Sequence, residues 1–155
     1  MTTKERPKII GVIGGRQVDG SLLKEAEKVG EIIAAQKALL VCGGLTGVME
    51  ASAKGAKAKG GITIGIIPHD HTREVNEYID IPIVTGMGIG RNVIIARTAD
   101  ALIAVGGEYG TLSEIAYALQ LGKTVVGIKT WDIKGVTPAK NAEDAVKKAL
   151  NSAAV

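Results

Sequence analysis

The sequence predicts one α/β domain over residues 1–155, with a doubly wound, mainly parallel sheet and helices on both faces. Short apolar runs alternate with segments of helical periodicity that are long enough to cross over between parallel strands. Four of these runs are followed directly by glycine clusters. Because helices cover both faces of a parallel sheet, its strands read as unbroken apolar runs, as they do here.

The individual elements follow from these runs and their spacing. Polar residues 1–7 are expected to form a flexible tail, and residues 141–155 a region built on the last helix, which we expect to pack on the sheet edge. Strands are predicted at residues 8–13, 38–42, 62–67, 81–84, 101–105 and 124–128, and helices at residues 22–36, 48–59, 91–99, 111–121 and 142–151.

Composition excludes several classes of function. No apolar run approaches the roughly 18 residues of a membrane helix, and no signal peptide is recognisable, so a cytoplasmic protein without membrane contact is expected. The net charge of +3 is too weak and too dispersed to predict a nucleic-acid partner. Cys42 is the only cysteine, and the triplet from His69 to His71 has a loop context without further ligands, so no metal site is expected.

The glycine clusters predict a ligand site. The carboxyl ends of parallel strands share one edge of the sheet, and ligands of open α/β folds bind there, where the strand order reverses. One cluster alone would indicate a turn, whereas four on one edge indicate a binding site. The residues that we expect to line it after the first, second and fifth strands are Gly14, Gly15, Gly43, Gly44 and Gly107.

The stretch ALIAVGGEYGTLSE at residues 101–114 gives the strongest local signal. Glycines after the apolar run allow a tight turn with positive φ. Thr111 and Glu114 have the spacing of a capping box, so the next helix is expected to begin at Thr111. The free N–H groups and partial positive charge of that helix terminus predict an anion site above the turn from Gly107 to Thr111.

Common nucleotide-binding motifs do not account for these loops. The chain has no GxGxxG, and residues 41–44 lack the acidic residue that holds an NAD ribose, which disfavours a dehydrogenase. Residues 122–124 read Gly-Lys-Thr, but Tyr117 stands where a P-loop needs its first glycine, and a strand follows where a helix is needed. A P-loop ATPase is therefore excluded.

Four stretches resemble the LOG and "lysine decarboxylase-like" Rossmann superfamily, and most closely its short molybdenum cofactor carrier-like branch. They are GVIGG at 11–15, CGGLTGVMEA at 42–51, TGMGIGRNVIIARTADALIAV at 85–105 and GGEYGTLSE at 106–114. The resemblance spans about residues 9–128 and implies a Rossmann-like fold in a homodimer or homotetramer. No lysine stands where a pyridoxal phosphate Schiff base would be expected, so decarboxylation is not expected.

The LOG motif PGGxGTxxE matches residues 106–114 with two departures, Gly106 for the proline and Glu108 for the second glycine. In LOG enzymes it serves the release of a free base from nucleoside 5′-monophosphates, whereas the carrier branch implies binding of a phosphorylated pterin without turnover. The resemblance assigns the active-site arginine and catalytic glutamate to Arg91 and Glu114, and the phosphate-binding turn to Gly107, Gly110 and Thr111.

Two functions therefore stay open. A binding protein for a nucleotide or a molybdopterin-type ligand, requiring no cofactor of its own, is favoured by the two departures and by the carrier branch. A nucleoside 5′-monophosphate phosphoribohydrolase is favoured by Arg91 and Glu114, because a carboxylate kept ionised by a guanidinium can stabilise an oxocarbenium-like sugar. The structural alternatives are that Glu114 only completes the helix cap and that Arg91 is a surface residue.

The segment 111–121 also predicts assembly. Its apolar surface is wider than a helix covering one sheet face requires, so we expect its outer side to be buried in a homo-oligomer, with residues 91–99 also at the interface. The residues that form this surface are Leu112, Ile115, Ala116, Ala118 and Leu119.

Overall fold

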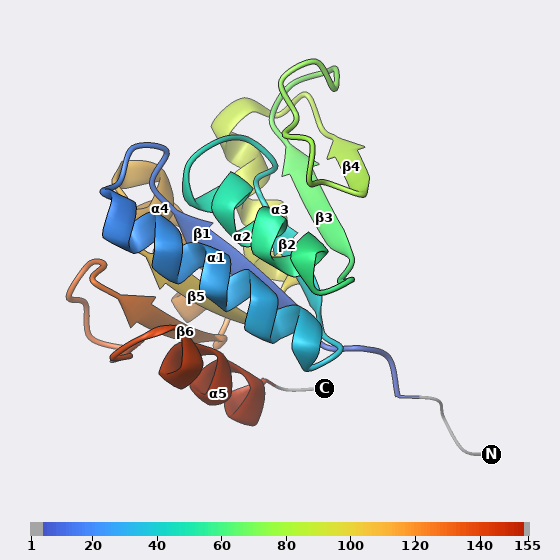
Figure 1. The fold of residues 1–155 in the computed structure, drawn as a ribbon. Coiled ribbons are helices and arrows are strands. Elements are labelled where there is room, and N and C mark those ends of the chain that lie inside the picture. The colour runs from blue at the N-terminus through green and yellow to red at the C-terminus, as the bar shows by residue number, and fades with distance from the viewer. Residues whose placement is uncertain (1–4, 154–155) are drawn as a thin grey trace.

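The computed structural model describes residues 5–153, and over this range the chain forms a seven-stranded, fully parallel sheet with five α-helices (Figure 1). The strand order is β4-β3-β2-β1-β5-β6-β7. The strands are β1 (Ile9–Gly14), β2 (Leu39–Cys42), β3 (Thr63–Ile67), β4 (Ile81–Val84), β5 (Ala101–Val105), β6 (Thr124–Ile128) and β7 (Val136–Pro138). The helices are α1 (Gly20–Ala35), α2 (Val48–Ala58), α3 (Arg91–Thr98), α4 (Tyr109–Gln120) and α5 (Ala142–Ser152), with a short 3₁₀ turn η1 (Gly88–Gly90).

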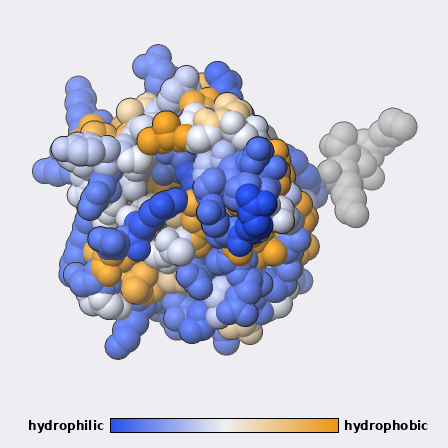
Figure 2. All heavy atoms as spheres, turned by 90° about the horizontal axis from the view of Figure 1, so that it is seen from above, coloured by the Kyte–Doolittle hydropathy of each residue, from blue (hydrophilic) through white to orange (hydrophobic). Residues whose placement is uncertain are grey.

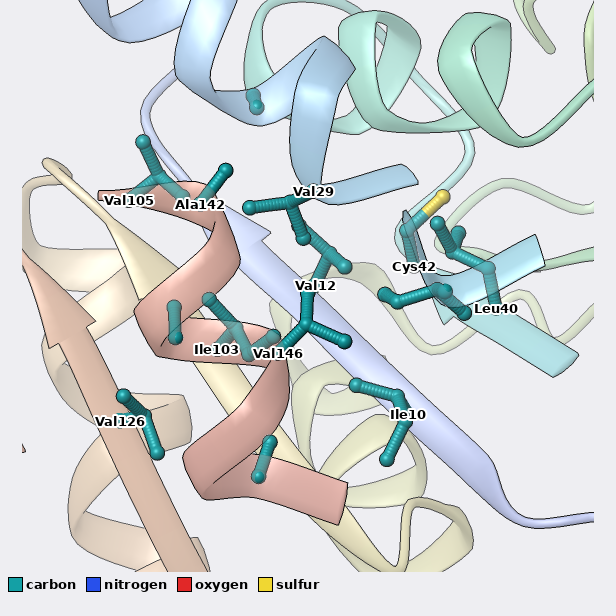
Figure 3. Packing of buried hydrophobic residues seen from close by; sticks show 14 of the residues in the cluster. Ile10, Val12, Val29, Leu40, Cys42, Ile103, Val105, Val126, Ala142 and Val146 are labelled. Atoms are coloured by element: carbon teal, nitrogen blue, oxygen red, sulfur yellow. The ribbon is translucent and has the colours of Figure 1, made fainter. Parts of the chain in front are cut away.

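Helices cover both faces of the sheet, as predicted. On one face, α1, α2 and α5 pack on the strands, and Val29 and Val146 meet Val12 and Ile103 there (Figure 3). On the other face, α3 and α4 pack on side chains such as Ile13. No helix in the described part of the chain is long and apolar enough to cross a membrane.

All six predicted strands and five predicted helices are present, with bounds that differ by at most two residues. The strand β7 was not expected. Because β7 occupies the sheet edge beside β6, the prediction that the last helix packs on the edge is wrong: α5 instead lies on the sheet face next to α1.

The two chain ends are only partly described. Residues 1–4 of the predicted tail and residues 154 and 155 of the C-terminal region lie outside the described residues. Within the tail, Arg6 is held by Asp100, with Nη2 of the arginine 2.6 Å from Oδ1. The same carboxylate accepts the backbone N–H of Ile9 at 2.8 Å, which fixes the entry into β1.

The position of the site is set where the strand order reverses. The chain adds β2, β3 and β4 on one side of β1, and then returns to place β5 on the other side. In the register of this parallel pair, Gly14 lies beside Val105. The turns that follow β1 and β5 are therefore neighbours at the carboxyl edge of the sheet.

Helices α1 and α2 approach each other closely at glycines. A Cβ atom added at Gly30 would overlap the carbonyl oxygen of Ser52, and one added at Gly55 would overlap that of Glu27. These two positions exclude any side chain, because the obstructing atoms belong to backbone that cannot rotate away.

We therefore expect Gly30→Ala to lower the free energy of unfolding by about 1–3 kcal/mol, since the two helices must separate to admit the methyl group. Gly20→Ala is the matched control, because Gly20 has open space around it, and it should change stability by about 0.5 kcal/mol or less. Urea unfolding of both variants measures the difference. A Gly30→Ala protein as stable as the wild type would contradict the close helix contact.

Candidate functional site

A cavity of about 530 Å³ opens at the carboxyl edge between β1 and β5. Figure 2 looks onto this edge and shows a hollow near the middle of the face. Its walls come from segments far apart in the sequence, which only the strand order brings together. The lining residues are Val12 to Gln17, Gly43, Met49, Pro68, His69, Gly88, Ile89, Arg91, Asn92, Glu108, Gly110, Thr111 and Glu114.

The turn after β5 forms one wall. Gly106 and Gly107 have φ angles of +58° and +106°, and a Cβ on Gly107 would overlap the Thr111 side chain. Both positions thus use the conformational freedom of glycine. Because the chain turns at these two glycines, α4 begins two residues before the expected start at Thr111. Glu108 is its N-cap and Tyr109 its first residue.

The predicted capping box is therefore wrong. Thr111 is the third residue of α4, and Glu114 lies one turn further along the helix, so neither side chain caps it. The first intrahelical bond joins the N–H of Leu112 to the carbonyl of Glu108 at 2.9 Å. The three preceding N–H groups have no helical carbonyl to reach, and two of them belong to Gly110 and Thr111 in the cavity wall.

The loop between β6 and β7 holds this turn in place. The Thr130 hydroxyl donates to the carbonyl of Gly106 at 2.6 Å, and the Trp131 indole N–H donates to that of Glu108 at 3.1 Å. The N–H of Gly106 is bound in turn by Ile128 at 3.0 Å. Sequence reasoning missed Thr130 and Trp131, because each lies more than twenty residues along the chain from its hydrogen-bond partner and no local motif indicates the contact.

Arg91 lies in the cavity wall with only 8% of its surface exposed, so the surface alternative is wrong. Its Nε donates to the carbonyl of Ile66 at 2.9 Å and its Nη2 to that of Gly43 at 3.4 Å, while Nη1 binds the side chain of Asn92. Burial lowers the pKa of this guanidinium, and the charge of Glu114 opposes the shift. The arginine joins the ends of β2 and β3 to the start of α3.

Glu114 lines the same cavity with 6% of its surface exposed. Within residues 5–153 its carboxyl group has no hydrogen-bond partner and forms no ion pair. Burial raises the pKa of Glu114 to about 8, and the nearby charge of Arg91 offsets only part of this rise. The expectation that Arg91 keeps the glutamate ionised is therefore not met.

The predicted glycines divide into two groups. Gly14, Gly15, Gly43 and Gly110 line the cavity. Gly44 and Gly107 stand behind the lining: Gly44 packs toward Ile67, and Gly107 supports the turn beneath Thr111.

His69 also reaches the cavity, although its triplet with Asp70 and His71 was read as a plain loop. Its Nε2 lies 2.7 Å from a carboxylate oxygen of Glu74, and its ring stacks on that of His71 with centroids 5.1 Å apart. Nδ1 of His69 is buried without a partner in the described structure. No group of three metal-ligating side chains occurs between residues 5 and 153.

Fold and cavity together define a Rossmann-like α/β protein whose candidate ligand site lies where the strand order reverses. The chain belongs to the SLOG cluster4 family, whose model matches residues 7–154. This confirms the LOG-type superfamily that the glycine motifs indicated.

Three relatives show how far the likeness extends. An uncharacterized protein of Archaeoglobus fulgidus is 49% identical over 144 residues, which cover 92% of this chain and 95% of the relative. The structure of the molybdenum cofactor binding protein from Rippkaea orientalis matches with a TM-score of 0.90 and 37% identity, over 96% of this chain and 98% of that one. The molybdenum cofactor carrier protein of Chlamydomonas reinhardtii matches with a TM-score of 0.86 and 36% identity, over 95% and 98%.

The role of the loop between β6 and β7 is testable by removing one hydroxyl. Thr130→Val keeps the side-chain shape but removes the donor to Gly106, and should lower the free energy of unfolding by about 1–2 kcal/mol. The amide NMR signals of residues 106–109 should shift with it. Thr137→Val on the exposed edge strand is the control and should be nearly neutral. Equal effects of the two substitutions would contradict the role assigned to Thr130.

Proposed function

We propose that the chain binds a phosphorylated pterin of the molybdopterin type, or a nucleotide of similar size, in this cavity and holds it without turnover. The main support for this proposal is the first turn of α4, whose free N–H groups lie in the wall of a cavity of about 530 Å³. That volume lies within the ordinary range of small-molecule sites. The similarity to molybdenum cofactor carrier and binding proteins over nearly the whole chain favours the pterin.

The phosphate fits best at the α4 terminus. Backbone N–H groups of Gly110 and Thr111, with the partial positive charge of the helix end, form a suitable anion site. Arg16, in the loop after β1, also lines the cavity and supplies a positive charge. Glu108 stands at the same rim and limits how many negative charges the site tolerates.

The ring fits the rest of the cavity. Met49, Pro68 and Ile89 provide apolar surface for a planar heterocycle. The ring of His69, from the loop after β3, adds a flat wall to this part of the cavity. The absence of a side chain at Gly43 leaves room for Met49 and the Arg91 guanidinium, which a Cβ there would overlap.

Hydrolysis of a nucleoside 5′-monophosphate is the second candidate, favoured by Arg91 and Glu114 standing in one cavity. Two observations weigh against it. With a pKa near 8, Glu114 is mostly neutral at pH 7, whereas an oxocarbenium-like sugar needs a negative charge beside it. Two of the donors of Arg91 are also bound to backbone carbonyls and not free for a phosphate.

Calorimetric titration with matched ligands tests the binding proposal. We expect 6-hydroxymethylpterin phosphate to bind at least tenfold more tightly than 6-hydroxymethylpterin, because only the former carries the anion for the α4 terminus. AMP and GMP, each followed by chromatography for free base, test the second candidate. Equal affinity with and without phosphate would contradict the proposed site, and released base at a catalytic rate would establish the hydrolase instead.

We further propose a homo-oligomer with the outer side of α4 at its interface. Ile115 and Ala118 are fully buried against the sheet, whereas Ala116 and Tyr117 face outward, and 43% of the tyrosine is exposed. Helix α3 packs beside α4 and is the second element that we place at this interface. An apolar exposed side of this kind is typical of subunit interfaces.

Light scattering at micromolar concentration should therefore give a dimer or tetramer mass, and Tyr117→Lys should reduce it. Ile83→Lys, on the exposed edge strand β4, is the control for an alternative interface along that edge. A monomeric wild type would contradict the assembly. Dissociation by Ile83→Lys alone would move the interface to the sheet edge.

A further inference from the structure

We propose that Glu114 acts in this cavity as a neutral hydrogen-bond donor, so that the ligand is bound together with a proton and is released as the carboxyl group ionises. The inference rests on the proposed function, because it requires a ligand in the cavity. It assigns to Glu114 neither the capping role nor the carboxylate role that the sequence suggested.

The geometry of the carboxyl group carries the proposal. Glu114 has 6% of its surface exposed and lines the cavity, yet no group within residues 5–153 donates a hydrogen bond to it or pairs with it. A buried ionised carboxylate without partners is strongly unfavourable, whereas a protonated one needs a single acceptor for its O–H. No hydrogen bond joins Glu114 to another residue of the described range, so a ligand in the cavity is positioned to accept from its O–H.

The surrounding groups do not change this balance. The positive charge of Arg91 lowers the pKa of Glu114. Its Nε and Nη2 donate to backbone carbonyls, so the arginine provides charge without a hydrogen bond to Glu114. The Cys42 thiol stays neutral, because burial raises its pKa to about 12. The other titratable groups that line the cavity are Arg16 from the loop after β1, His69 from the loop after β3, and Glu108 from the N-cap of α4.

A neutral Glu114 also explains how an anion and an acidic side chain can share one cavity. A phosphate at the α4 terminus would repel an ionised carboxylate one turn along the same helix, and both would compete for the same helix dipole. Protonation removes the repulsion and turns the side chain into a donor. The site therefore selects a ligand with a phosphate and, at the Glu114 position, an acceptor such as a ring nitrogen or carbonyl oxygen.

Glu114→Gln provides the test, because its amide is neutral and donates at every pH. With GMP and 6-hydroxymethylpterin phosphate as probes, the two proteins should have Kd values within about threefold of each other at pH 6.5. For a pKa near 8, the ratio of wild-type to Glu114→Gln Kd should rise about thirtyfold by pH 9.5. Taking this ratio removes the effect of the ligand's own phosphate ionisation, which both proteins share.

Glu108→Gln is the matched control, since it removes a carboxylate from the same cavity at its exposed rim. It should leave the pH dependence of the wild type in place. A ratio for Glu114→Gln that stays constant from pH 6.5 to 9.5, or loss of binding by Glu114→Gln at pH 6.5, would overturn the donor role while the proposed function stands. If neither probe binds the wild type at any pH, the proposed function fails and this inference with it.

Carbon NMR of the side-chain carboxyl gives a readout that needs no ligand. The Glu114 signal, assigned by its loss in Glu114→Gln, should titrate with a midpoint near pH 8 in the free protein. A midpoint near that of an ordinary glutamate, about 4.3, would contradict the proposal even if the ligand binds.

Discussion

The cavity exists because β1 and β5 run side by side in the same direction while their following helices leave on opposite faces of the sheet. Helix α1 continues from β1 on one face, and α4 continues from β5 on the other. The two turns must part at the carboxyl edge, and a crevice opens between them. Both strand ends are close enough that a Cβ at Gly14 would overlap the carbonyl of Val105. This strand reversal fixes the position of everything else in the site.

Most of the fold could be predicted from sequence because local signals and tertiary packing agree. The apolar runs that form β4, β5 and β6 are bounded by polar or glycine residues, so even their ends could be located. The strand β7 has three residues and ends in proline, which leaves no period to detect. Its presence at the edge then determined where α5 packs. The wrong prediction for the position of α5 thus goes back to a strand too short to show a sequence pattern.

The sequence predicted which residues lie in the site better than it predicted their hydrogen bonds and pKa values. Glycine motifs located the edge, and Arg91 and Glu114 do share the cavity. The spacing of Thr111 and Glu114 imitates a capping box, but the left-handed backbone of the preceding glycines decides where α4 begins. Acceptors of Arg91 include backbone carbonyls at the ends of distant strands, and the raised pKa of Glu114 follows from burial. Neither property is written in local sequence, because both arise only when the chain is folded.

The proposed function requires that an anion-bearing ligand binds at the start of α4. A crystal structure of the protein with 6-hydroxymethylpterin phosphate tests it most directly. We expect the phosphate to lie within hydrogen-bond distance of the N–H groups of Gly110 and Thr111, with the ring in the cavity near Glu114. A phosphate bound elsewhere, such as in the groove between α1 and α5 beside Lys28 and Lys147, would contradict it.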